Sequence, residues 1–82
     1  MCLAIPGKIM DIQITEDKIF QIGKVSFSGI MRDVNLSMVP EARVGDYVLV
    51  HVGLAVSVVD EEEAQKTLNY LKDNGELDEL ME

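Results

Sequence analysis

Residues 47–59 read Tyr-Val-Leu-Val-His-Val-Gly-Leu-Ala-Val-Ser-Val-Val, and this stretch indicates how the chain folds. Short runs rich in β-branched residues and separated by a glycine are typical of adjacent β-strands. The first run is apolar on nearly both faces, as expected where one face fills a barrel and the other lies under a covering element. We therefore predict strands at residues 47–52 and 54–59, with Gly53 at a bulge or sharp bend.

The same apolar pattern extends back toward the N-terminus as far as Gly7, interrupted by short clusters of turn residues. It predicts three further strands, at residues 8–14, 18–27 and 30–39, and Pro40 is expected to end the last of them. Five short strands in a curled antiparallel sheet are typical of a small barrel. The predicted fold is mainly β, a five-stranded OB-like β-barrel followed by a C-terminal α-helix.

The periodicity changes from strand to helix at Asp60. Asp60 is the expected N-cap, and Glu63 stands three residues later, where it completes a capping box. Asn74 and Gly75 are expected to end the helix. An apolar stripe at helical spacing lies between these ends and can pack on the sheet: Ala64, Leu68 and Leu71.

The length and the charge place further bounds on the protein. Its 82 residues suffice for one domain, expected as a barrel with an N-terminal cysteine arm (1–59) and an acidic helix and tail (60–82). The net charge is −8, and nine of the fifteen acidic residues lie in 60–82. This balance argues against nucleic acid and anionic membranes as partners, because both bind clustered basic side chains.

A lone cysteine and the lack of a membrane-spanning or signal-like run predict a cytoplasmic protein.

Cys2 is the most informative residue by position. Removal of Met1 would expose its thiol and α-amine together, and these are soft donors suited to iron, copper or zinc. The alternative is a cysteine that packs as a small hydrophobe. Pro6-Gly7 is expected to turn the chain, so that residues 2–5 form an arm beside the barrel. With one Cys and one His, the chain cannot close a four-ligand zinc site with soft ligands, so any metal is expected to be shared with another molecule.

His51 is predicted on the same strand face as Tyr47 and Leu49. Two interpretations stay open: a metal ligand or proton carrier, and a structural histidine hydrogen-bonded to the backbone. Arg32-Asp33 is either a partner-facing ion pair or a solvated pair worth about 0–1 kcal/mol. Two strand methionines are expected as core filler: Met10 and Met38.

Three segments together resemble the HypC (HybG, HupF) family of nickel-iron hydrogenase maturation chaperones. They are Met-Cys-Leu-Ala-Ile-Pro-Gly at residues 1–7, Gly-Ile-Met-Arg-Asp-Val at 29–34, and the run from Val44 to Ala55 that contains His51-Val52-Gly53. The joint presence of the Met-Cys-x-x-x-Pro start and the His-Val-Gly run is specific, whereas either alone is weak.

The resemblance implies a non-enzymatic chaperone that carries an iron centre with cyanide and carbonyl ligands. Such proteins complex HypD while the centre is assembled, contact HypE through that complex, and then bind the immature hydrogenase large subunit. The essential cysteine of the family corresponds to Cys2 and its histidine to His51, the expected iron ligands. The residues expected to contact partners are Cys2, Leu3, Ile5, Pro6, Arg32, Asp33 and His51.

Two other classes of protein were weighed against this one. An OB-type adaptor or single-strand nucleic-acid-binding module needs a basic groove and stacking aromatic residues. A cysteine-based redox enzyme needs a second, resolving cysteine, and the chain has only Cys2.

Overall fold

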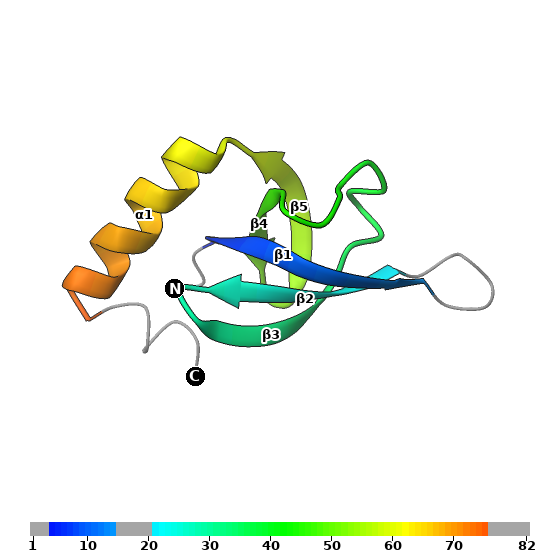
Figure 1. The fold of residues 1–82 in the computed structure, drawn as a ribbon, viewed down its shortest axis with the longest axis horizontal. Coiled ribbons are helices and arrows are strands. Elements are labelled where there is room, and N and C mark those ends of the chain that lie inside the picture. The colour runs from blue at the N-terminus through cyan, green and yellow to red at the C-terminus, as the bar shows by residue number, and fades with distance from the viewer. Residues whose placement is uncertain (1–3, 15–20, 76–82) are drawn as a thin grey trace.

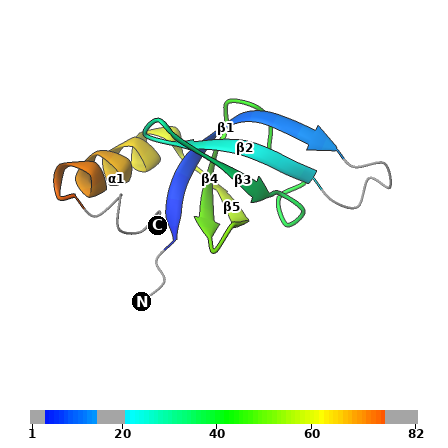
Figure 2. The same cartoon turned by 90° about the horizontal axis from the view of Figure 1, so that it is seen from below.

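The protein is described from a computed structural model, which covers residues 4–14 and 21–75. Five strands form a closed barrel in the order β1-β2-β3-β5-β4, and one helix follows them (Figures 1 and 2). The prediction of a mainly β, five-stranded OB-like barrel with a C-terminal helix is therefore confirmed. The elements are β1 (Ile5–Ile14), β2 (Gln21–Phe27), β3 (Ile30–Asn35), β4 (Tyr47–His51), β5 (Leu54–Val59) and α1 (Glu61–Asp73).

The first strand is the longest of the five and pairs with a different neighbour along each part of its length. Its start pairs antiparallel with β4, with Ile5 opposite Val50, and the rest pairs antiparallel with β2 across a bulge near Met10. Closure between β3 and β5 is much slighter, since only Asn35 and Leu54 pair there, in parallel. The barrel is thus extensively paired between β1 and its two neighbours, whereas a single residue pair closes it between β3 and β5.

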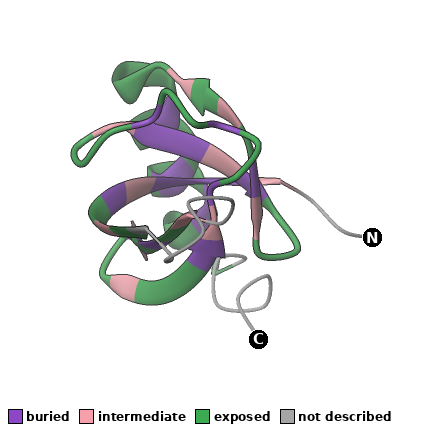
Figure 3. Ribbon diagram, turned by 90° about the vertical axis from the view of Figure 1, so that its right-hand side faces the viewer, coloured by how far each residue is buried: buried purple, intermediate pink, exposed green. Residues whose placement is uncertain are grey.

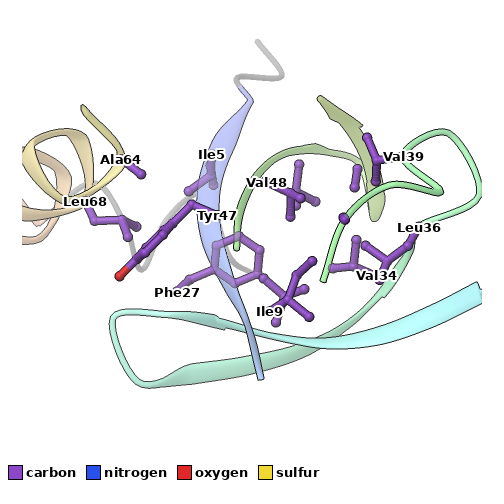
Figure 4. Close-up of a cluster of buried hydrophobic side chains, with 14 of the residues drawn as sticks. Ile5, Ile9, Phe27, Val34, Leu36, Val39, Tyr47, Val48, Ala64 and Leu68 are labelled. Atoms are coloured by element: carbon purple, nitrogen blue, oxygen red, sulfur yellow. The ribbon is translucent and has the colours of Figure 1, made fainter. Parts of the chain in front are cut away.

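The apolar core fills the barrel and continues under the helix. Most buried positions, purple in Figure 3, lie in the strands and in the loop after β3. Three more lie on α1: Ala64, Leu68 and Leu71. Val48 and Val50 of β4 are buried, while Tyr47, on the other face of β4, lies next to Leu68 of the helix in Figure 4. Its hydroxyl also accepts a hydrogen bond from Gln65 Nε2 of α1. This confirms the prediction that one face of this strand fills a barrel and the other lies under a covering element.

The helix begins and ends as its sequence predicts. Asp60 is the N-cap, and its carboxylate accepts a hydrogen bond of 3.2 Å from the Glu63 N–H. The C-cap is Asn74, and the three residues of the apolar stripe are all buried. No helix in the described parts of the chain has the length and apolar character needed to cross a membrane.

The third strand is shorter than predicted. It ends at Asn35, not before Pro40, because the Asn35 Oδ1 accepts a hydrogen bond of 2.8 Å from the Ser37 N–H and so bends the chain. Leu36 and Val39 remain buried after the strand has ended, so the apolar pattern continues into the loop. Of the second predicted strand, residues 18–20 lie outside the described residues.

Two local interpretations of the sequence were wrong, and the end of one strand was predicted one residue too late. Pro6 and Gly7 do not turn the chain away from the barrel; both belong to β1 and pair with β4. Gly53 does lie at a sharp bend, the two-residue hairpin turn that it forms with Val52, both with positive φ (75° and 51°). Because Val52 belongs to this turn, β4 ends at His51, one residue earlier than predicted. The two methionines expected in the core are both exposed, because one lies at the β1 bulge and the other in the turn after Asn35: Met10 (48%) and Met38 (62%).

Candidate functional site

The start of β1 and the end of β4 lie side by side at one end of the barrel. Ile5 pairs with Val50, so Ala4 stands next to His51 in the same antiparallel register. Figure 2 shows β1 beginning beside the hairpin that joins β4 and β5. The sequence-predicted residues Ile5, Pro6 and His51 are thus brought together, and the two that precede Ala4, Cys2 and Leu3, lie outside the described residues.

A shallow pocket of about 130 Å³ opens between this end of the barrel and α1. Cofactor and small-ligand sites commonly measure about 300–1,000 Å³, so this pocket suits one apolar side chain better than a cofactor. Ala4 and Leu49 form part of its wall on the strand side, and Glu63 places a carboxylate at its helix side. The full lining comprises Ala4, Pro6, Leu49, Val59, Glu63, Ala64 and Thr67.

His51 is the exposed polar residue beside this pocket. Its imidazole has no hydrogen bond or ion pair with any part of the chain that the structure describes. The interpretation as a structural histidine bonded to the backbone therefore gains no support within the described chain. The ring nitrogens are open to a proton, a metal or a partner.

A complete metal site is not present among residues 4–14 and 21–75. No three His, Cys, Asp or Glu side chains within these ranges are grouped so that they could hold an ion. A metal bound beside His51 would need donors from Cys2 or from another molecule. The arrangement can contribute to a shared site and cannot supply one from the described residues alone.

Arg32 and Asp33 lie elsewhere, on β3, which is separated from β4 by β5 in the barrel order. Asp33 is paired with Lys24 of β2 at 2.6 Å, so its ion-pair partner is Lys24. Arg32 donates a hydrogen bond of 3.0 Å from Nη1 to the Met31 carbonyl. The structure therefore does not join these two residues to the site at His51.

Some features of this end were missed by the sequence analysis. The pocket is assembled from β1, β4, β5 and α1, so no local pattern reveals it. Val52, at the tip of the neighbouring hairpin, is 79% exposed and has a φ of 51°, an uncommon conformation for a β-branched residue. The Val-Gly pair between two strand runs was the available signal, since hairpin turns are short and contain glycine.

The aromatic residues do not favour the nucleic-acid-binding alternative. Phe27 and Tyr47 are buried, at 2% and 4% exposure, and cannot stack on bases. Tyr70, on the helix, is the exposed aromatic residue among those described.

Comparison with known proteins gives a consistent result. The chain matches the HupF/HypC family profile over residues 1–71. Hydrogenase maturation factor HypC of Synechocystis sp. is 52% identical over 75 residues, which cover 92% of this chain and 99% of that protein. Hydrogenase maturation factor HypC of Cupriavidus necator is 43% identical, with 83% and 70% covered. Hydrogenase maturation factor HybG of Escherichia coli is 42% identical, with 88% and 89% covered.

Proposed function

Because the chain belongs to the HupF/HypC family, we propose that it is a hydrogenase maturation chaperone with no catalytic activity of its own. It complexes HypD while the Fe(CN)₂CO centre is assembled, meets HypE through that complex, and delivers the centre to the immature large subunit of a nickel-iron hydrogenase. Cys2 is the residue that holds the iron. The observation that carries this proposal is the match to the HupF/HypC family over residues 1–71, together with an exposed His51 beside the strand end that follows Cys2 in the sequence.

An incomplete site is what a carrier of a metal centre requires. Low-spin iron with strong-field ligands is suited to a soft thiolate, which Cys2 supplies. A protein that surrounded the iron with its own ligands would hold it too firmly to pass it on. The described residues contribute one exposed imidazole here and no cluster of three donors. The remaining ligands are therefore contributed by partners, each in turn.

Cys2 is close enough in the sequence to Ala4, the neighbour of His51, for both residues to reach one metal ion. Residues advance along an extended chain by at most about 3.6 Å each, so the Cys2 Cα lies within about 7 Å of the Ala4 Cα. Ala4 stands next to His51, at an end of β1 that is fixed by its pairing with β4. One iron can thus be reached by the Cys2 thiolate and, as a second and weaker donor, by the His51 imidazole.

The pocket beside His51 supplies a contact for the partner that does not involve the iron. Its walls are mostly apolar, and Glu63 stands at its helix side. Asp60, Glu61 and Glu62 precede Glu63 and are exposed. The partner surface that fits is an apolar side chain flanked by basic residues, because buried apolar area gives affinity and opposite charge gives orientation.

The test is co-purification with HypD from hydrogenase-expressing cells, with infrared detection of the metal cyanide and carbonyl bands. Wild-type protein should carry the bands, and Cys2→Ala should lose them while keeping its circular dichroism spectrum. Retention of the bands by Cys2→Ala would refute the role of this thiol and make His51→Ala the next variant to measure.

A matched control places the thiol elsewhere. Met38 is 62% exposed and lies in the loop after β3, so Met38→Cys in the Cys2→Ala protein restores an exposed thiol at a different place. The bands should stay absent from this double variant. Their return would mean that any exposed thiol suffices and that the position of Cys2 is unimportant.

A further inference from the structure

Val52 lies at the tip of the hairpin between β4 and β5, in a backbone conformation that valine rarely adopts. His51 and Leu54 pair across the hairpin, so Val52 and Gly53 are its two loop residues. Their φ angles are 51° and 75°, and two positive φ angles in a two-residue loop are typical of a type I′ turn. Asparagine and aspartate are favoured as the first residue of such a turn, whereas a β-branched residue there is a genuine outlier.

The hairpin between β2 and β3 shows that the turn itself does not require valine. Phe27 pairs with Ile30, so Ser28 and Gly29 form a second two-residue loop. Their φ angles are 53° and 97°, again both positive. The first loop residue is here small and polar, and the Gly29 N–H donates a hydrogen bond of 3.1 Å to the Ser26 Oγ. The chain thus forms the same kind of turn with a serine where the other turn has a valine.

Packing within the protein does not explain the valine either. Val52 is 79% exposed, the highest value for a large apolar residue within residues 4–14 and 21–75. A residue so exposed adds little to the apolar core. Strained backbone conformations are concentrated at binding and active sites, where the strain is part of the function. Val52 combines strain with an exposed apolar side chain, and contact with a partner accounts for both.

Val52 directly follows His51, at the end of the barrel that forms the candidate site. Neighbouring Cα atoms are about 3.8 Å apart, so a molecule that binds the His51 imidazole also comes close to Val52. Leu49, which lines the pocket, precedes Val52 by three residues, or about 10 Å along the strand. Figure 2 shows the hairpin between β4 and β5 beside the beginning of β1. The strained valine, the exposed imidazole and the pocket therefore belong to one end of the molecule.

We propose that Val52 is an apolar anchor for HypD and enters an apolar cavity on the HypD surface. The inference rests on the proposed function, in which HypD is the first protein to share a metal with this chain. No three His, Cys, Asp or Glu side chains among the described residues are grouped to hold that metal, so HypD supplies donors close to His51. Bonds from a metal to nitrogen or sulfur measure only about 2.0–2.3 Å. The residue next to His51 is then inside the contact between the two proteins.

The stiffness of Val52 suits it to this role. Branching at Cβ restricts its χ1 torsion, and the two-residue loop is held by paired strands on both sides. A side chain that is already fixed loses little conformational entropy on binding, so more of the free energy of contact remains as affinity. Burial of a valine side chain corresponds to roughly tenfold to hundredfold in affinity. Asparagine at this position would relax the turn and remove the apolar surface.

A second copy of this chain is a less suitable occupant. Each copy carries a net charge of −8, so two copies repel each other. A symmetric contact between two hairpin tips also buries little surface, whereas specific interfaces bury about 1,200–2,000 Å². Size-exclusion chromatography with light scattering would reveal self-association as a dimer mass. A dimer that is lost in Val52→Asn would assign the contact to a second copy and overturn the proposal.

The test compares stability and HypD affinity in one set of variants. Val52→Asn should raise the Tm by about 4 °C or more, because asparagine tolerates the positive φ. It should also weaken binding to purified HypD by about tenfold or more in isothermal titration calorimetry. Val52→Ile keeps a branched apolar side chain, so its Tm and affinity should stay close to wild type. A residue that served only the fold would not move stability and affinity in opposite directions.

Val44→Asn is the matched control. Val44 is 59% exposed and precedes the opposite end of β4, so this substitution removes an exposed apolar side chain away from His51. Its affinity for HypD should equal that of wild type. Equal losses of affinity in Val44→Asn and Val52→Asn would show that exposed apolar surface acts without regard to position, and would overturn the proposal.

The remaining outcomes separate this inference from the proposed function. Wild-type affinity in Val52→Asn would refute the anchor and leave the chaperone role standing. A lower Tm in Val52→Asn would show that the valine stabilises the fold, and would overturn the argument from strain. A wild-type protein that did not bind HypD would refute both the anchor and the proposed function.

Discussion

Substitution of Gly7 by alanine tests the packing at the point where β1 passes from β2 to β4. A Cβ built on Gly7 would lie 2.5 Å from Val25 Cγ1 and 2.7 Å from Phe27 Cε1. Both side chains are buried, at 0% and 2% exposure, and cannot move aside freely. Overpacking of this kind costs about 1–3 kcal/mol. Replacing a strand glycine by alanine recovers about 0.5–1 kcal/mol, so the net loss lies between about 0 and 2.5 kcal/mol. Because the close contacts are with two buried side chains, we expect Gly7→Ala to lie in the upper part of this range and to lower the free energy of unfolding by about 1–2 kcal/mol.

The measurement is thermal and urea unfolding followed by circular dichroism. A domain of this size loses about 4–8 °C in Tm for each kcal/mol. A double-mutant cycle with Val25→Ala removes the atom nearest to the added methyl group. The methyl group should then fill part of the space that valine leaves. The double variant should therefore lose less unfolding free energy than the sum of the two single variants, by at least about 0.5 kcal/mol. Strict additivity of the two substitutions, or an unchanged Tm for Gly7→Ala, would refute the close-approach argument.

Three further substitutions have definite expected results. Val52→Asn should raise the free energy of unfolding by about 1 kcal/mol, seen as a higher Tm, because asparagine tolerates the positive φ that strains valine. Asp60→Ala should lower it by about 1 kcal/mol by removing the cap on the Glu63 N–H, and a Tm equal to wild type would exclude the cap as a stabilising contact. Thr67→Trp should fill the pocket and weaken the HypD complex in a pull-down. Tyr70→Trp, on the exposed side of the helix, is the control and should leave the complex unchanged. Equal effects of the two substitutions would show that the pocket does not contact HypD.

The local parts of the fold were predictable from sequence. The cap at Asp60, the end of the helix at Asn74 and the two-faced strand at Tyr47–His51 follow from residues close together in the chain. The predicted extension of the third strand failed because Leu36 and Val39 keep the apolar pattern after the Asn35 side chain has ended the strand. Buried apolar residues usually belong to paired strands, but Leu36 and Val39 are buried in the loop that follows β3.

Features that depend on distant contacts were not predictable. Gly7 follows a proline and suggests a turn, whereas its actual role depends on side chains from β2. The position of His51 was predicted, but its exposure depends on where α1 and the hairpin end. The narrow pairing of β3 with β5 at Asn35 and Leu54 results from the point at which β5 begins relative to β3, which no single segment of sequence encodes.

If the chain delivers a metal centre as proposed, the pairing of Ile5 with Val50 also bears on the order in which partners bind, because it fixes the strand end that follows Cys2 in the sequence. Two residues of extended chain span at most about 7 Å, so little room would be left for two docked proteins to reach a residue two positions from a fixed strand end at the same time. On the proposed function, HypD and the large subunit are therefore expected to occupy the chaperone one after the other. An excess of free HypD should then act as a competitive inhibitor of delivery, and undiminished delivery in that excess would refute the proposed order.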